Sequence, residues 1–393
     1  MLRADPFDEP AERLVLRETV SRLLGDRLPT ERALALDRDG SFDRDLWREL
    51  GSMGALGLGA DEAVGGSGGT VGDAASVTEE LARVLPSLAV DHVLSGMVMR
   101  MLSDPRSGVA SAWLPELAAG TRICSFGLSE PEAGTDLLGL RTTARESGGS
   151  WVLNGQKTWI SLAQEAEAVF VLARTDAPQE GRRSRGLSVI AVPTDQPGVH
   201  VRRVHLAGMR AAITCEVFLS DAVAPLDHLV GERGRGMALL ARTLDVERVM
   251  AAAISLGIGR AALDLHVAHA SARTAFGRPI GAFQAVQHPA ADSVAELAAA
   301  RALVESAVRV IERAAPSEDS RAMTLSAMAK LIAGETTARV VDRGMRAMGA
   351  MGLAEESAMQ MYFRDARLQL FSPVSNEMVR NVLAESLGLP RSY

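Results

Sequence analysis

The first part of the chain has the spacing of apolar residues that is typical of amphipathic helices. From Glu12 onward apolar residues recur near helical spacing with charged residues between them, and this pattern extends to about Leu117. A glycine-dense segment, AVGGSGGT at 63–70, interrupts it, and a second helical stretch runs from Asp73 to Val84. We therefore expect a helical N-terminal domain over residues 1–120.

From Ile123 to Val230 the pattern changes to short apolar runs that are typical of β-strands. Polar turns separate the runs SWVLNG (150–155), AVFVLART (168–175), GLSVIAVP (186–193) and CEVFLSD (215–221). The pair Asn154-Gly155 favours a type I′ hairpin turn between 151–153 and 158–160. We expect a central β domain over residues 121–232, with 176–186 as an exposed loop.

After Gly236 the chain is again helical and rich in Ala, Leu, Met and Arg. Ser293 and Glu296 have the spacing of a capping box, and Pro316 would end the long helix that starts there. A second long helix is expected from about Asp319 to Ala347. The pattern predicts an α+β fold that is mostly α, with a C-terminal helical bundle over residues 233–393.

Composition narrows the function classes. The chain has 393 residues, 47% hydrophobic and 23% charged, as in ordinary globular proteins. Its net charge of −7 and the lack of a long basic run argue against a nucleic-acid partner. Cys124 and Cys215 have neither metal nor disulfide spacing, so we expect two buried apolar thiols and no metal site. With neither a signal peptide nor an apolar run of membrane-spanning length in the sequence, we expect a cytoplasmic protein and no membrane partner.

Two nearby segments, FGLSEPEAGTD at 126–136 and LNGQKTWIS at 153–161, combine residue types that suit a bulky ligand. Gly134 lets backbone N–H groups approach it, and the hydroxyls of Ser129 and Thr135 are able to bond its polar edges. Trp159 adds a large aromatic ring and Ser161 a further hydroxyl. Together, the two segments resemble the flavin-binding signature of the acyl-CoA dehydrogenase family. The resemblance extends over most of the chain.

This resemblance implies an N-terminal helical domain, a central β-barrel or β-sandwich domain, and a C-terminal four-helix bundle that together bind FAD. In the first segment it assigns contacts with the flavin, its ribityl-phosphate chain or the bound thioester to Phe126, Leu128, Ser129, Gly134 and Thr135. In the second it places Trp159, Ile160 and Ser161 against the isoalloxazine ring, with the hydroxyl near N5. A hydroxyl suits that place because N5 accepts the hydride and its hydrogen bonding tunes the acceptance.

Two later segments resemble further parts of the family's cofactor site. RTAFGRPIGAFQAVQH at 273–288 resembles the element that reaches a neighbouring subunit's FAD. The resemblance assigns Arg273 to the pyrophosphate, which suits its planar guanidinium, and Phe276 and Gln284 to the same cofactor. DRGMRAMGAMGL at 342–353 places Arg346 and Gly349 where the family has a Gln ahead of a Gly-rich turn, and a purely structural helix end is the alternative there. A homo-oligomer, as a dimer of dimers, follows from the resemblance.

The catalytic base is the point at which this chain departs from most of the family. Dehydrogenation of an acyl thioester requires a base for the α-proton, while the β-hydrogen leaves as hydride. Most members use a loop Glu after Y-R-D-A, but here the run YFRDARLQLFSPVSNEM at 362–378 has Pro373 at that position. Ser375 and Glu377, which follow it, are assigned to the cofactor site.

A smaller branch of the family takes its Glu from an L-D-x-E-R sequence on a bundle helix, and this chain has that sequence at 244–248. The resemblance therefore implies Glu247 as the base. Arg248 would support the bound thioester, together with Thr135, or orient Glu247. The alternative is that this patch is a solvated helix face.

The expected function is oxidation of an acyl-CoA, or another acyl thioester, to its trans-2-enoyl form, with electrons passed to an electron-transfer flavoprotein. Two alternatives remain open. One is an oxidase or flavin monooxygenase of the same fold, which has no particular need for Glu247. The other is a non-catalytic subunit of a hetero-oligomer, which would fit the departures at Arg346 and Pro373.

Overall fold

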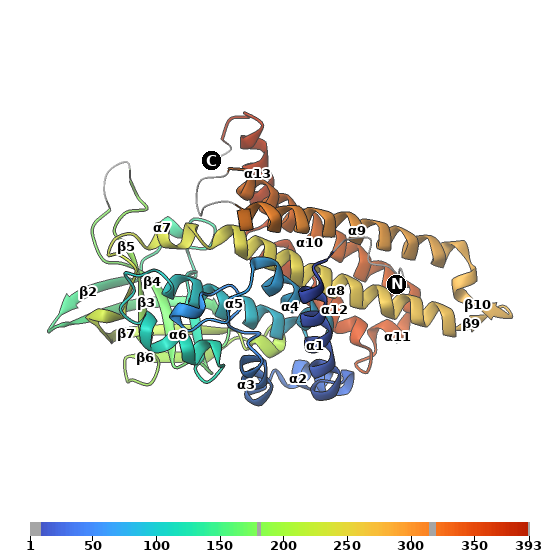
Figure 1. Ribbon diagram of the computed structural model, residues 1–393, viewed down its shortest axis with the longest axis horizontal. Helices are drawn as coiled ribbons and strands as arrows, with labels where there is room; N and C mark the ends of the chain where they lie inside the picture. Colours follow the sequence, from blue (N-terminus) through green and yellow to red (C-terminus); the bar gives the residue numbers. More distant parts are fainter. Residues whose placement is uncertain (1–8, 179–181, 314–319, 392–393) are drawn as a thin grey trace.

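The computed structural model describes residues 9–178, 182–313 and 320–391. Within these ranges the fold is α+β and mostly α, as expected, because helical segments precede and follow one β-sheet along the chain. The helices form a long body, and the sheet lies at one end of it, on the left in Figure 1.

The N-terminal helices precede the sheet; α1 to α4 and the start of α5 pack into the same core as the C-terminal bundle, whereas the end of α5 and α6 pack against the sheet. Thr70 and Asp73 form a capping box at the start of α4, so this helix begins two residues before the expected Asp73 and ends at the expected Val84. The bounds are α1 (Ala11–Arg27), α2 (Thr30–Asp39), α3 (Arg44–Ser52), α4 (Val71–Val84), α5 (Pro86–Leu102) and α6 (Ala110–Ala118).

The sheet is mixed, with strand order β6-β7-β3-β2-β4-β5-β8, and β1 pairs with β4 in parallel. Its inner residues are apolar and almost fully buried, as in β4 and β5. The bounds are β1 (Cys124–Gly127), β2 (Thr143–Ser147), β3 (Ser150–Ile160), β4 (Ala168–Arg174), β5 (Leu187–Pro193), β6 (Val199–Arg203), β7 (Cys215–Pro225) and β8 (Leu229–Val230).

The hairpin expected at Asn154-Gly155 is wrong, because both residues lie inside the continuous strand β3. The hairpin turn is instead at Gly148-Gly149, between the paired residues Ser147 and Ser150. Gly155 marks a bulge against β7, at a positive φ of 151°. A Cβ there would meet the Thr142 hydroxyl at 2.4 Å, so the glycine serves close packing rather than a turn.

The C-terminal helices form the long bundle, in which α8 packs against α4, α9 and α10. By length and hydropathy alone α8 is able to span a membrane, but 78% of its most apolar window is buried inside the protein, as for a core helix. The bounds are α7 (Gly236–Ala241), α8 (Leu244–Ala272), β9 (Thr274–Ala275), β10 (Arg278–Pro279), α9 (Gln284–Arg313), α10 (Ser320–Met348), α11 (Ala350–Leu353), α12 (Ala358–Asp365) and α13 (Asn376–Ser386).

The capping box expected at Ser293 is also wrong. Helix α9 begins at Gln284, and the Ser293 hydroxyl, inside the helix, donates to the backbone carbonyl of Pro289. Pro316 and Asp319, the expected end of this helix and start of the next, lie outside the described residues. Helix α10 otherwise matches the second long helix that the sequence predicts.

A buried cluster of charges ties the N-terminal helices to the bundle. The Glu79 carboxylate on α4, 2% exposed, accepts from Arg17 on α1, Arg260 on α8 and Arg301 on α9. These three cations hold the pKa of Glu79 well below its usual range despite the burial, which opposes ionisation. The cluster fixes four helices around one point.

Candidate active site

The structure brings the two flavin-signature segments side by side. Thr158 N donates to Ser129 O over 2.9 Å, and the Ser125 hydroxyl donates to Ser161 O over 2.8 Å. The first contact joins the loop after β1 to β3, and the second joins β1 itself to the residue that follows β3. The hydroxyls and the aromatic ring that the sequence assigns to one ligand therefore belong to one surface region.

A buried ion pair that the sequence did not predict fastens these two segments. Lys157 of β3 is 0% exposed, and its Nζ donates to Glu130 Oε1 over 2.8 Å and to Leu128 O over 3.0 Å. Burial lowers the pKa of Lys157 to about 8 against the attraction of Glu130. The backbone N–H groups of Arg141 and Thr142 also donate to Glu130, and with Lys157 they hold the pKa of this carboxyl below its usual value despite burial.

Some of the predicted flavin-contacting residues are buried or half-buried, and the others are exposed. Phe126 and Ile160 are buried, and Leu128, Ser129 and Ser161 are half-buried. Gly134, Thr135 and Trp159 are exposed, and a Cβ on Gly134 would meet nothing within 4 Å. Trp159 is 61% exposed and has a φ of 62°, a left-handed conformation that costs roughly 1–3 kcal/mol in a non-glycine residue. Such a strained, exposed aromatic ring fits a ligand-binding role.

Glu247 lies in the first turn of α8 and is half-buried. Burial raises the pKa of its carboxyl to about 7, while the neighbouring Arg248 opposes the shift. Its carboxylate forms no hydrogen bond or ion pair within the described part of the chain. The segment before it lies against the sheet domain, since Leu240 of α7 shares a core cluster with Phe126. Glu247 is therefore an unpaired carboxyl whose pKa lies near neutrality, on the helix that follows the α7 segment packed against the sheet domain.

Arg248 is held by its neighbours rather than by Glu247. Its Nη1 donates to Asp245 Oδ1 over 2.9 Å, and the Ser326 hydroxyl of α10 donates to the same oxygen. Its Nε is buried, with no partner among the described residues. One donor of this guanidinium thus remains for a ligand, as the predicted thioester contact requires.

The loop that carries Pro373 is held in place by a buried lysine that the sequence analysis did not single out. Lys330 of α10, 1% exposed, donates from Nζ to Val374 O over 2.6 Å and to Asn376 Oδ1 over 2.7 Å. The Ser375 hydroxyl accepts from Met378 N and caps α13, and Glu377 in its first turn is exposed. Ser375 therefore has a structural role here, and the predicted cofactor roles of both residues stay predictions.

The remaining predicted cofactor residues lie at the other end of the molecule. Arg273 and Gln284 are exposed on either side of the β9–β10 hairpin, and Phe276 at its turn is 95% exposed with a φ of 53°. Arg346 and Gly349 are also exposed, at the end of α10, where Arg346 pairs with Asp342 over 2.9 Å. Figure 1 shows this hairpin at the end opposite the sheet. Within one chain these residues do not meet the flavin-signature segments.

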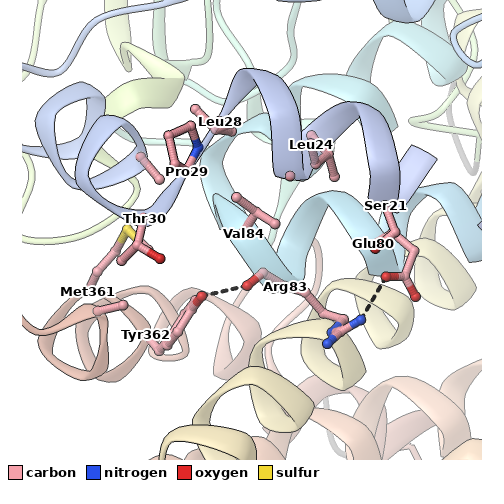
Figure 2. A pocket seen from close by; sticks show the side chains of 13 residues that line it. Ser21, Leu24, Leu28, Pro29, Thr30, Glu80, Arg83, Val84, Met361 and Tyr362 are labelled. Carbon is pink, nitrogen blue, oxygen red and sulfur yellow. Dashed lines mark hydrogen bonds and ion pairs between the residues drawn. The ribbon is translucent and has the colours of Figure 1, made fainter. Parts of the chain in front are cut away.

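A cavity of about 260 Å³ lies elsewhere, between α1, α2, α4 and α12. Figure 2 shows the Tyr362 hydroxyl pointing at the backbone carbonyl of Arg83, whose guanidinium bonds Glu80. None of the predicted site residues lines this cavity. Among residues 9–178, 182–313 and 320–391 no cluster of three or more His, Cys, Asp or Glu is arranged to hold a metal ion.

Comparisons with known proteins agree with this geometry. Family models for the acyl-CoA dehydrogenase N-terminal, middle and C-terminal domains match residues 10–121, 125–222 and 234–388. The chain is 34% identical over 391 residues to acyl-CoA dehydrogenase FadE12 of Mycobacterium tuberculosis, covering 98% of this chain and 99% of that one. It is 35% identical over 387 residues to benzylmalonyl-CoA dehydrogenase of Aromatoleum aromaticum, covering 97% and 99%.

The fold is similar to a solved glutaryl-coenzyme A dehydrogenase in complex with glutaryl-CoA, with a TM-score of 0.91, 29% identity and 98% of each chain covered. Sequence and structure thus match the family from end to end, through all three of its domains. The chain belongs to the acyl-CoA dehydrogenases, a family of flavoprotein oxidoreductases.

Proposed function

We propose that this protein oxidises an acyl-CoA thioester to the trans-2-enoyl thioester with FAD and passes the electrons to an electron-transfer flavoprotein. The observation that carries the proposal is Glu247, an unpaired carboxyl whose pKa burial raises to about 7, in the first turn of the helix that follows α7, whose Leu240 shares a core cluster with Phe126. The loop position that most of the family uses for the base is Pro373, which has no acidic side chain.

The residues present fit FAD. Trp159 is an exposed aromatic ring on which a flat ring system is able to stack, and the open space above Gly134 leaves room for a bulky group. The residues that would hold the flavin and its ribityl chain are those of 126–135 and 159–161. Arg273 and Arg346 are exposed cations suited to a pyrophosphate, and Phe276 supplies a second exposed ring.

In the proposed reaction the substrate loses an α-proton and a β-hydride, and a carbon–carbon double bond forms between the two carbons. When bound, FAD supplies the acceptor for the hydride. The Glu247 carboxylate takes the α-proton and becomes the neutral acid. A pKa near 7 suits this task, because the group is partly ionised at neutral pH yet more basic than an exposed carboxylate.

We also propose that the active form is a homo-oligomer. One chain carries the flavin-signature segments at one end and the exposed Arg273 and Phe276 at the other. The Phe276 ring, 95% exposed beside the exposed Arg273, suits a site completed on a second copy. The dimer of dimers rests on resemblance to the family.

The test is anaerobic titration of the purified protein with a panel of acyl-CoA thioesters, followed by absorbance. The proposal predicts a yellow homo-oligomer whose flavin absorbance is bleached by at least one thioester, with the trans-2-enoyl product recovered. A colourless protein that takes up no FAD would favour the non-catalytic subunit. A flavin that a thioester bleaches and that O₂ then reoxidises directly would favour the oxidase, whereas a flavin that no thioester bleaches but that yields an oxygen-dependent product after reduction by another donor would favour the monooxygenase.

A further inference from the structure

The chain has two lysines, and both lie in the interior of the protein. Of its 42 lysines and arginines all but Lys157 and Lys330 are arginine, and these two are 0% and 1% exposed. Each donates to one backbone carbonyl and one side-chain oxygen of a segment that is predicted to form the site. An ammonium group is more compact than a planar guanidinium, so it suits a narrow buried position. The two places where this arginine-rich chain keeps a lysine are thus both contacts to predicted site segments.

Lys330 holds the Pro373 loop, residues 371–375, and the start of the helix that follows it. Its ammonium group donates to Val374 O over 2.6 Å and to Oδ1 of Asn376, the first residue of α13, over 2.7 Å. The Val374 side chain packs against a buried cluster that includes Leu331, the next residue of α10. The loop is therefore fixed to α10 by an apolar contact and by two charge-assisted hydrogen bonds.

The same face of α10 also contacts the first turn of α8. Ser326, one helical turn before Lys330 and 0% exposed, donates to Asp245 Oδ1 over 3.0 Å. Arg248 Nη1 donates to the same oxygen over 2.9 Å. Burial lowers the pKa of Lys330 to about 8 against the attraction of nearby carboxylates, and the positive charge of Arg248 adds to this shift. One face of α10 therefore joins the Pro373 loop to the turn that carries Glu247.

The loop and this turn belong to the same part of the proposed site. By resemblance to the family, Pro373 stands at the position from which most members take the base, and Glu247 at the position that the smaller branch uses. A base at either position removes the same α-proton, so both positions lie beside the same substrate carbon. The loop gives this chain no base, but its place relative to Glu247 limits how a thioester lies against the carboxylate.

We propose that Lys330 is a positioning residue for the dehydrogenation, which holds the Pro373 loop at a fixed place relative to Glu247. This inference rests on the proposed function, because it takes Glu247 as the base. The reaction requires the α-proton to face the carboxylate while the β-hydrogen faces its acceptor. A displacement of about 1 Å in such an arrangement is enough to lower the rate on the order of 10²-fold. Lys330 acts through the loop and touches neither the substrate nor the cofactor.

The experiment compares Lys330→Met with the wild-type holoenzyme in anaerobic single-turnover reduction by the acyl-CoA that reduces the wild type best. Methionine has nearly the length of lysine and fills the buried position, but it donates no hydrogen bond. The reduction rate at saturating thioester should fall about tenfold or more, while the Kd of the thioester changes less than about threefold. Lys330→Gln, which keeps an N–H donor, should recover part of the rate.

The matched control is Arg380→Met. Arg380 of α13 pairs with Glu335 of α10, so it joins the same two helices as Lys330 does, but at the surface. An exposed ion pair contributes little, and this variant should keep the wild-type rate. If Lys330→Met does not fold, Asn376→Ala takes its place. It removes one of the two hydrogen bonds of Lys330, and the rate should fall about threefold or more.

Two further readouts separate positioning from other roles. Hydrogen exchange needs no turnover: the peptide that spans residues 374–379 should exchange faster in Lys330→Met than in the wild type, while peptides of β4 stay unchanged. The pH dependence of kcat/KM should keep its midpoint at about 7 in this variant, because Glu247 and not Lys330 titrates. A midpoint that disappears with Lys330 would make the lysine itself the titrating group and overturn the proposal.

The proposal is also overturned if the reduction rate stays unchanged in the Lys330 variant, or in Asn376→Ala where that variant replaces it. Faster exchange without a loss of rate would leave Lys330 a structural role alone, and a loss confined to Kd would make it a binding determinant. If no thioester reduces the flavin of the wild type, the proposed function itself has failed and the positioning role falls with it. The wild-type titration by itself identifies that result.

Discussion

The Lys157–Glu130 pair joins the two flavin-signature segments. Replacing Glu130 with an uncharged residue should make the stability of the protein depend on pH. In the native protein Lys157 has a pKa of about 8, against 10.5 for a free lysine, because burial outweighs the attraction of Glu130. Glu130→Gln leaves the ammonium buried with the Leu128 carbonyl and an amide oxygen. We expect its pKa to fall below neutral pH, so that the lysine folds as the neutral amine.

The size of the effect follows from the difference between these pKa values. Each pKa unit corresponds to about 1.4 kcal/mol, so the pH-dependent loss of stability in Glu130→Gln is about 1.4 kcal/mol at pH 7, one unit below the native pKa of about 8. It grows to about 2.7 kcal/mol at pH 6 and disappears above about pH 8. The sign follows because the unfolded variant binds a proton that the folded variant does not, so raising the pH stabilises the variant.

The assay is chemical unfolding of wild type and variant at pH 6, 7 and 8, at one protein concentration and saturating FAD, because self-association and a bound cofactor both shift an unfolding midpoint. Lys157→Met is the matched control. Combined with Glu130→Gln in a double variant, it leaves neither group of the pair to titrate, so the difference of that double variant from the wild type should stay nearly constant over this range. The reasoning would be refuted if the loss of unfolding free energy in Glu130→Gln did not change with pH, or if it grew as the pH rises.

Two further predictions concern the cofactor and the base. Arg273→Ala should weaken FAD retention by roughly 1.5–3 kcal/mol, the range for a hydrogen bond to a charged group, as measured by flavin loss on dilution. Arg38→Ala, an exposed arginine on α2, is the control, and equal FAD retention in both variants would contradict the assignment. Separately, kcat/KM for flavin reduction should rise with pH through about 7 and then level off, because Glu247 acts as a base only when ionised. A rate that falls over this range would assign the titration to another group.

The order of helices, strands and helices followed from the sequence because each depends on local periodicity. The end of α4 was confirmed for the same reason. The burial of Cys124 and Cys215, predicted from their lack of metal or disulfide spacing, was also confirmed. The hairpin error has a tertiary cause. Asn154-Gly155 lies in a strand whose partner, β7, is about 60 residues later, and pairing with it overrides the turn preference of this dipeptide.

The parts of the candidate site that the sequence did not reveal are contacts between distant residues. In the sequence, Lys157 is a lysine in a predicted strand and Glu130 an acid in a predicted loop. Only the fold shows that they form a buried pair. Lys330 lies 44 residues before the Val374 carbonyl that it binds.

The central claim, that Glu247 is the base, is tested most directly by single-turnover flavin reduction in Glu247→Gln under anaerobic conditions. The glutamine keeps the size of the side chain but accepts no proton, so thioester binding should survive while reduction slows by at least about 10²-fold. Glu377→Gln is the matched control, because this exposed carboxylate follows the altered loop and should matter much less. Reduction that survives in Glu247→Gln and collapses in Glu377→Gln would contradict the account and move the base to the C-terminal loop.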